Sequence, residues 1–439
     1  MNSPNHDESK QEEANGAVPE LFHVWNRSVG HGAIAAKAPE NVLSSGYMFK
    51  IYDVERENYM LTQLKPLLFT VRLLFKYPYI IDGTGKIGMK WFSIWTLYTV
   101  VGYVVQTLLG LELMYRLFGM VSIESDFILI VKIGVNILTI MTLLYTPLSA
   151  LMEWRAYCIY FNQWIALQVD FEEITGKPFN THMNLLIKIF IGVIAVQAYV
   201  AVYMGTNTLT QPFWYHKYVY MMVFLALPQQ LFLWVVCQYE SGRMGALLKD
   251  YIIEVFGNDS PMNNAPNAVR VRMLWLRLVY IVKLLGRAAF TIIVLLMTAG
   301  VVFLTGAYVI LTGYIKGDPR TSEFLGPVLI GASLIVVICE FGHRTTVQVG
   351  AEICEALVNL KSATMDRETT IEVERFLRIA AFNAPKVSVA GLAIIDRSTL
   401  VSICKNVITY LIVLIQFQIT NDQGISSSAQ PAMKNKPAF

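Results

Sequence analysis

The residues most able to do chemistry lie in the last long apolar segment, residues 396–421. Polar or bulky side chains recur there at steps of three and four positions, and we call these positions the polar stripe: Ser402, Lys405, Asn406, Thr409, Val413, Gln416, Phe417 and Thr420. At 3.6 residues per turn, such positions share one face of a helix. The other face is rich in leucine and β-branched residues, which suits contact with lipid or with neighbouring helices. The segment therefore has one side that water can wet.

Two interpretations of the polar stripe are open from the residues alone. Polar groups exposed to lipid without partners would cost several kcal/mol, so the stripe must be covered. It either hydrogen-bonds to other helices of one bundle, each contact contributing about 1 kcal/mol, or it lines a water-filled path between subunits. The second arrangement would make a channel.

The composition indicates a membrane protein. Of the 439 residues, 55% are hydrophobic and 15% are charged, against roughly 45–50% apolar and 25% charged in soluble proteins. The net charge of +3 is too small and too dispersed to suggest nucleic-acid binding. The composition therefore favours lipid, other subunits and small molecules as partners, and excludes an ordinary soluble enzyme.

Seven apolar segments are long enough to be membrane-spanning helices, which predicts an all-α membrane protein. A helix of about 20 residues crosses a hydrocarbon core of about 30 Å. Five segments meet this length clearly, and two are shorter or carry one charge. The five are residues 91–111, 133–152, 189–216, 218–239 and 288–315, and the two are residues 324–339 and 398–421.

The basic residues predict the orientation of these seven helices. Lys and Arg gather in the second, fourth and sixth connecting loops, and basic loops stay in the cytosol. The N-terminus is then cytosolic and the C-terminus extracellular, which is opposite to a G-protein-coupled receptor. The sequons at Asn26 and Asn258 would both face the cytosol, so we expect neither to be glycosylated.

The predicted domain organisation follows from these boundaries. The inner ends of several helices extend past the membrane, with one continuous helix expected over residues 269–314. A capping box at Thr369 and Glu372 predicts a further inner helix. The expected parts are a disordered cytosolic tail (1–60), a basic amphipathic helix at the membrane surface that starts at Pro66 (61–88), a bundle of six membrane helices (89–345), cytoplasmic anchor helices (346–395), the last membrane helix with its polar stripe (396–421) and an extracellular tail (422–439). Residues 61–88 could equally be an extension of the first membrane helix.

Other classes of function find little support. The five cysteines show neither disulfide nor zinc spacing, and residues 1–20 do not read as a cleaved signal peptide. No histidine within the membrane segments has a carboxylate or thiol at catalytic spacing, so we expect no enzymatic activity, no metal and no cofactor. A transporter would require broken helices and internal repeats, and Pro228 is the one candidate break.

Residues 409–417 also carry a motif. They read Thr-Tyr, five hydrophobic residues and Gln-Phe. This motif is similar to the signature that closes the last membrane helix of the insect gustatory receptors, relatives of the insect odorant receptors. The long segment before the first membrane helix, together with residues 160–164 and 175–177, resembles the carbon dioxide receptor group of that family, and fructose-receptor relatives are the alternative.

The resemblance implies a function. Members of the family are ligand-gated, non-selective cation channels in the plasma membrane of sensory neurons, built as homo- or heterotetramers on a cytoplasmic anchor. Thr409 would line the pore, and Val413, Gln416 and Phe417 would form its outer constriction. Heteromeric assembly with a related receptor is implied for the carbon dioxide group. A receptor that signals through a cytosolic transducer is the competing interpretation, which the cytosolic N-terminus disfavours.

The resemblance also implies a ligand site in the outer half of the first six membrane helices. The polar and aromatic candidates there are Tyr199, Tyr203, Tyr220, Phe224, Thr305, Tyr308 and Ser333. Carbon dioxide has few atoms and would bind weakly in a small pocket, whereas a sugar needs many hydrogen-bonding side chains. His216, near the outer surface, is expected to be solvated, although its titration could respond to carbon dioxide hydration.

Overall fold

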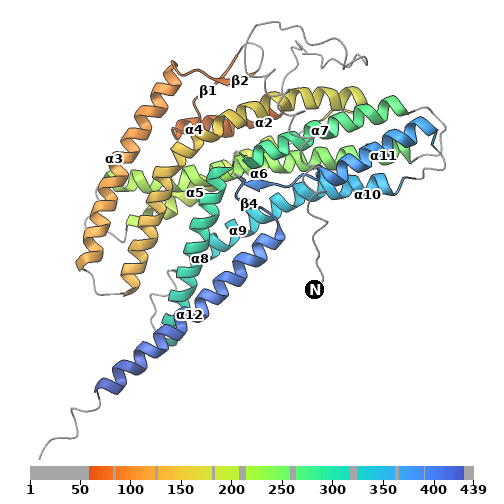
Figure 1. Ribbon diagram of the computed structural model, residues 1–439. Helices are drawn as coiled ribbons and strands as arrows, with labels where there is room; N and C mark the ends of the chain where they lie inside the picture. The colour runs from red at the N-terminus through yellow and green to blue at the C-terminus, as the bar shows by residue number, and fades with distance from the viewer. Residues whose placement is uncertain are drawn as a thin grey trace, which may run out of the picture. The chain divides into compact units, whose positions relative to one another are not determined.

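Helices make up most of the described chain in the computed structural model (Figure 1). The structure describes residues 59–82, 86–123, 127–179, 183–206, 214–257, 264–287, 289–316, 324–360, 365–389 and 391–429. The predicted tail, residues 1–60, lies almost entirely outside these residues. The prediction of an all-α membrane protein is confirmed.

The long helices match the seven predicted membrane segments. They are α3 (Ile94–Ile123), α4 (Phe127–Thr175), α5 (Asn184–Thr206), α6 (Trp214–Phe256), α8 (Phe290–Lys316), α9 (Leu325–Thr346) and α12 (Arg397–Ala429). Among the described residues, five helices are long and apolar enough to cross a membrane, and they lie in α3, α6, α8, α9 and α12. Two shorter apolar stretches, Leu129–Thr142 in α4 and Ile187–Val196 in α5, complete the set. Helix α9 ends at Thr346, next to the predicted end of the bundle at residue 345, and α12 continues beyond residue 421 to Ala429.

The segment predicted as one amphipathic helix, residues 61–88, is only half helical. Helix α2 (Tyr59–Leu73) contains Pro66 rather than starting there. An antiparallel hairpin follows, in which β1 (Tyr79–Ile81) pairs with β2 (Ile87–Met89). The apolar face of α2 is buried in the main core of the protein, against α5 and α6. Protein therefore covers the face that the sequence suggested would lie on lipid.

The continuous helix predicted over residues 269–314 is broken. Helix α7 (Ala265–Arg287) ends before α8 begins at Phe290, and Figure 1 shows the two running in different directions. The backbone N–H of Thr291 in the first turn of α8 donates to Glu153 of α4. In a continuous helix this N–H would donate to a carbonyl of the same helix. Here the Glu153 carboxylate accepts it instead, so a contact with another helix stabilises the break.

The predicted anchor region, residues 346–395, is mostly helical and packs on α6 and α7. It comprises a short π-helix, η2 (Val347–Ala351), then α10 (Glu352–Val358), α11 (Arg367–Phe382) and a final hairpin. The indole N–H of Trp275 in α7 donates to the Val349 carbonyl of η2 at 2.8 Å. Two side-chain ion pairs join the same helices: Lys249 of α6 with Glu352 of α10, and Arg272 of α7 with Glu372 of α11. A third pair, Arg277 with Asp170, joins α7 to α4 instead.

Helix α11 begins earlier than the capping box suggested. Its N-cap is Asp366, whose carboxylate accepts the Thr369 N–H at 3.1 Å. The expected cap, Thr369, lies inside the first turn. Hydrogen bonding from the Thr369 side chain, together with that from its backbone N–H, lowers the pKa of Asp366, as expected for an ionised N-cap.

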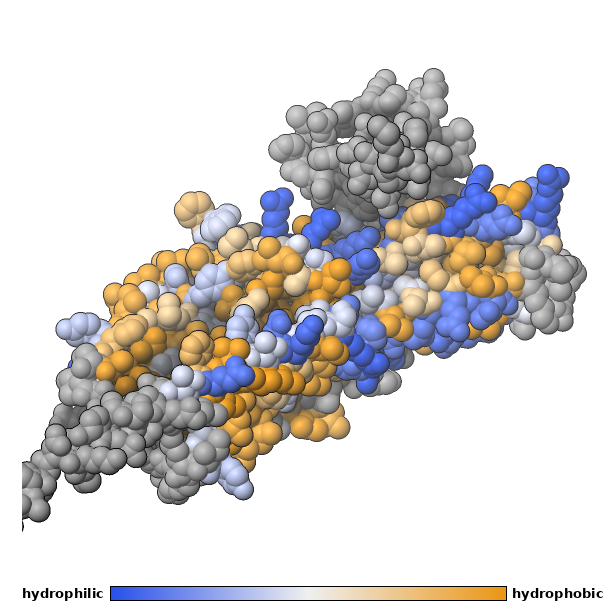
Figure 2. Space-filling model, turned by 60° about the horizontal axis from the view of Figure 1, so that its bottom comes forward, coloured by the Kyte–Doolittle hydropathy of each residue, from blue (hydrophilic) through white to orange (hydrophobic). Residues whose placement is uncertain are grey.

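Apolar residues gather on one part of the surface, and hydrophilic residues are more frequent toward the opposite end, where they alternate with apolar ones (Figure 2). On α3 alone, the exposed apolar side chains include Leu97, Val101, Val104, Leu108 and Leu111. A lipid-facing band and a water-facing inner end would produce this distribution.

Candidate functional site: the last helix and its inner joint

The chain enters α12 through a tight hairpin. β3 (Ser388–Val389) pairs antiparallel with β4 (Ala393–Ile394), and Gly391 in the turn has a φ of +74°. Asp396 then caps the helix, because its Oδ1 accepts the Thr399 N–H at 2.8 Å. The start of α12 is therefore fixed by its own local bonds.

An ion pair ties this start to α9. Arg397 donates from Nε to Glu340 Oε2 at 3.0 Å and from Nη2 to Glu340 Oε1 at 2.9 Å. Arg344, one turn further along α9, also donates to Oε1, at 2.7 Å. Next to this pair, Gly342 approaches Ile395 closely. We call these four contacting residues, Glu340, Gly342, Ile395 and Arg397, the inner joint.

Helix α12 packs on its own chain along one narrow face. The inward-facing positions are Leu400, Ile403, Val407, Leu411 and Ile415, of which Val407 is the most buried. This face lies against α8 and α9 (Figure 1). Only 6% of the apolar window of α12 is buried in the chain. Most of the helix must therefore be covered by something other than its own chain.

The polar stripe lies on the side of α12 opposite the packed face. Each residue turns a helix by about 100°, which places the stripe about half a turn away from Val407. All four predicted pore residues are exposed, with 39% exposure at Val413 and 71% at Phe417, alongside Thr409 and Gln416. These four residues share one face of α12, as the sequence predicted. That this face lines a pore stays a prediction.

The structure reveals an ionic cluster at the other end of the bundle that the sequence did not predict. Glu112 of α3 binds Arg116 and accepts the Tyr215 hydroxyl at 3.3 Å. His216 Nε2 lies 3.4 Å from Glu112 Oε2, and the histidine side chain is 1% exposed. The expectation that His216 is solvated was wrong, because α3 and α6 bury it between them.

A second unpredicted cluster is fully buried and joins four segments. Lys76 Nζ donates to Gln230 Oε1 at 2.8 Å, and Gln230 Nε2 donates to Glu153 Oε2 at 3.0 Å. The Thr291 hydroxyl also donates to Glu153, at 3.2 Å. Burial lowers the pKa of Lys76 and raises the pKa of Glu153, because each charge is removed from water. The cluster connects the segment after α2 to α4, α6 and α8.

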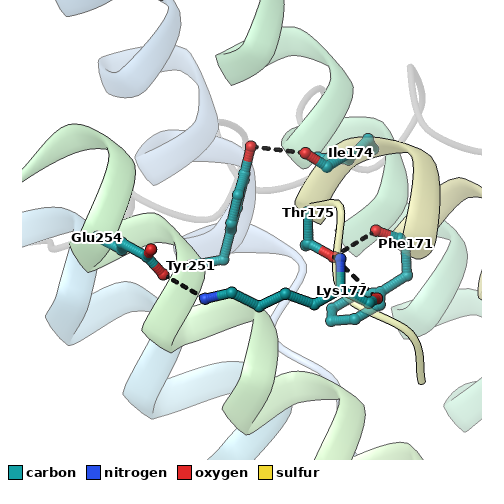
Figure 3. Close-up of polar contacts among 6 residues, drawn as sticks. All are labelled: Phe171, Ile174, Thr175, Lys177, Tyr251 and Glu254. Carbon is teal, nitrogen blue, oxygen red and sulfur yellow. Dashed lines mark hydrogen bonds and ion pairs between the residues drawn. The ribbon is translucent and has the colours of Figure 1, made fainter. Parts of the chain in front are cut away.

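The two short segments that carried the finer resemblance have structural roles. Tyr160 and Trp164 are fully buried in the main core, and the Tyr160 hydroxyl lies 3.0 Å from the Cys237 carbonyl. Thr175 ends α4, and its hydroxyl accepts the Lys177 N–H (Figure 3). Tyr251 of α6 donates to the Ile174 carbonyl at 2.8 Å. These residues dock α4 on α6.

The described residues contain no group of His, Cys, Asp and Glu that could hold a metal ion.

The model for the 7tm chemosensory receptor family matches residues 65–421, which is most of the chain. The chain is a member of the 7tm chemosensory receptor family. The match ends just past the polar stripe, so the inner joint and the pore-lining candidates of this receptor all fall within the family region.

Several insect receptors are similar in sequence. Gustatory and odorant receptor 22 of Anopheles gambiae is 24% identical over 62% of this chain and 59% of its own length. Gustatory and odorant receptor 21a of Drosophila melanogaster is 25% identical over 66% of this chain and 65% of its own length. The matches therefore span about three fifths of these relatives. Receptor 24 of Anopheles gambiae is 21% identical over 81% of this chain.

The fold is shared with a solved structure. The olfactory receptor OR5 from Machilis hrabei matches with a TM-score of 0.58 and 11% identity, over 82% of this chain and all of the solved chain. The same receptor in complex with eugenol matches with a TM-score of 0.57. At this identity the likeness establishes the fold of the chemosensory receptor and no more.

The predicted ligand residues of this receptor lie in different environments. Tyr199 is exposed and Tyr220 is completely buried. The hydroxyls of Thr305 and Ser333 donate to carbonyls of their own helices, and Tyr308 is half-buried. The side chains of Tyr203 and Phe224 lie outside the described residues. The structure therefore leaves the ligand site a prediction.

Proposed function

We propose that this receptor is a subunit of a ligand-gated, non-selective cation channel in the plasma membrane of chemosensory neurons. Four subunits, identical or related, would surround a pore lined by α12. The observation that carries this proposal is the exposed polar stripe on the side of α12 opposite its packed face. If the polar groups held one bundle together, they would face α8 and α9, on which α12 packs. The most buried residue of α12 is instead the apolar Val407.

The side chains of the polar stripe predict a pore that discriminates weakly among cations. A ring of Val413 side chains can close a pore by excluding water, and amides at Gln416 can replace part of an ion's hydration without a fixed charge. The stripe carries no acidic residue between Ser402 and Thr420. Discrimination among small cations is therefore expected to be poor.

The ligand we propose is carbon dioxide, with fructose as the alternative. The proposal rests on the resemblance of residues 160–164 and 175–177 to the carbon dioxide receptor group. Those residues lie in the packed core and at a helix end, so they support group membership rather than a contact with the ligand. Steps of carbon dioxide, bicarbonate and fructose on cells expressing the receptor alone and with related receptors would identify the ligand.

Cysteine accessibility tests the pore. Single cysteines at Thr409, Val413 and Gln416 should react with a positively charged, water-soluble thiosulfonate reagent, and the reaction should change the current. The matched control is Ile408→Cys, which is 60% exposed in the chain but lies off the polar stripe. Equal reaction at Ile408 and Gln416, or none at the stripe during activation, would contradict the pore.

Current recordings from excised membrane patches distinguish the channel from the competing function, signalling through a cytosolic transducer. A channel keeps its ligand-evoked current when the cytosol is removed, whereas a receptor that depends on a transducer loses it. Retained current that is altered by Gln416→Ala would support the channel.

A further inference from the structure

The inner joint is the one described place where charged side chains connect α12 to the rest of the chain. Glu340 contributes both carboxylate oxygens to Arg397, in a two-point geometry that fixes direction as well as distance. The Glu340 side chain is 25% exposed and that of Arg397 is 60% exposed, so water reaches the pair. Such a pair can break and re-form.

Helix α9 is in turn closely packed on α8. A Cβ atom on Gly331 of α9 would lie 3.0 Å from the Ala299 carbonyl oxygen of α8, so the two backbones nearly touch. Because α8 and α9 are in such close contact, a displacement of one must carry the other with it. Glu340 lies nine residues further along α9 and would move with that pair.

Helix α12 has few other attachments. Its packed face is narrow, and among the described residues its principal neighbours are α8 and α9. Two of the contacts that fix its first turn lie in the inner joint, the Arg397 pair and the Ile395 approach to Gly342. The inner joint is therefore where movement of the bundle can reach the last helix most directly.

We propose that Glu340 and Arg397 are positioning residues for gating: their ion pair holds the inner end of α12 to the α8–α9 pair and so limits opening of the pore. The proposal rests on the proposed channel function. It assigns the restraint to Arg397 and not to Arg344, which binds the same carboxylate but belongs to α9 itself.

The test measures how fast a positively charged thiosulfonate reagent modifies Gln416→Cys at the cell surface without added ligand. In that background, Arg397→Gln and Glu340→Gln should each raise the modification rate about two- to fivefold, the effect of losing a partly exposed ion pair. The double variant should add little to either single one. Arg344→Gln is the matched control and should leave the rate near that of the parent, and Arg397→Lys should restore part of the restraint.

The outcomes separate the two proposals. If Gln416→Cys is not modified in any background, either without ligand or while ligand activates the receptor, the channel proposal fails. If it is modified, but Arg397→Gln leaves the rate unchanged or lowers it, the positioning role is overturned and the channel proposal stands. A rise that Arg344→Gln reproduces overturns the positioning role as well. Surface labelling of each variant corrects the rates for differences in expression.

Discussion

Gly342 and Ile395 are so close that a side chain at position 342 has no room. A Cβ atom there would lie 2.7 Å from Ile395 Cγ2 and 2.9 Å from the Ile395 carbonyl oxygen. The side-chain carbon could rotate away, but the backbone oxygen sits at the entry to α12 and cannot move alone. The contact therefore sets the distance between α9 and the first turn of the last helix.

Gly342→Ala should separate α9 from the entry of α12 and lower stability by about 1–3 kcal/mol, the usual cost of overpacking. The measurement is the melting temperature of the detergent-solubilised receptor, followed by size-exclusion chromatography after heating. Gly326→Ala on the same helix is the control, since a Cβ there meets nothing within 4 Å. Because alanine favours a helix over glycine, the control should be neutral or slightly stabilising. Equal melting temperatures for the two variants would contradict the close approach.

In the buried cluster around Lys76, a second substitution should recover part of the stability that the first one removes. Lys76→Met or Glu153→Gln alone should cost about 3–5 kcal/mol, because each removes one end of the buried Lys76–Gln230–Glu153 hydrogen-bond chain and leaves the charge at the other end without its opposite. The double variant should recover a large part of that loss. Melting temperature and surface expression of the three variants measure this. A double variant as unstable as the sum of the single ones would show that the two residues act independently.

Substitutions at two neighbouring positions at the end of α4 should lower the stability of the receptor by different amounts. Gly176 has a φ of +65°, where an alanine is strained by about 1–2 kcal/mol. Lys177 pairs with Glu254, but both side chains are more than half exposed, so Lys177→Ala should cost at most about 1 kcal/mol. Melting temperatures should therefore fall more for Gly176→Ala. The reverse order would mean that the Lys177 pair is the stronger link between α4 and α6.

The predicted orientation can be tested by glycosylation. The natural sequons at Asn26 and Asn258 should remain unmodified, because their side of the membrane never meets the glycosylation machinery. A sequon inserted into residues 207–213 should be modified and shift the protein on a gel after glycosidase treatment. A glycan at either natural site would reverse the orientation and with it the side on which the inner joint lies.

The periodic features of this fold were predictable from the sequence. Apolar runs located all seven membrane helices, and the three- and four-residue spacing placed Thr409, Val413 and Gln416 on one face. What the spacing could not reveal is which face of a helix its own chain covers. The structure shows the exposed side of α12 by contrast: Val407 is its most buried residue, and the helix packs on α8 and α9.

The missed features depend on contacts between distant residues. Lys76 meets Gln230, 154 positions away, and Gln230 meets Glu153, 77 positions away. The break between α7 and α8 also involves Glu153, which receives the Thr291 amide from outside the helix. Strands as short as Tyr79–Ile81 and Ile87–Met89 are too brief to show an alternating pattern. Local periodicity has no information about such partners.

The narrow packed face of α12 has a genetic consequence. Since the helix touches its own chain so little, its surroundings in the proposed channel would be lipid on one side and neighbouring copies on the side of the polar stripe. A single altered copy would then change the environment of its normal neighbours, so heterozygous animals carrying a substitution on the exposed side should show a dominant sensory defect. A substitution at Val407 should instead be recessive, because its effect stays within one polypeptide.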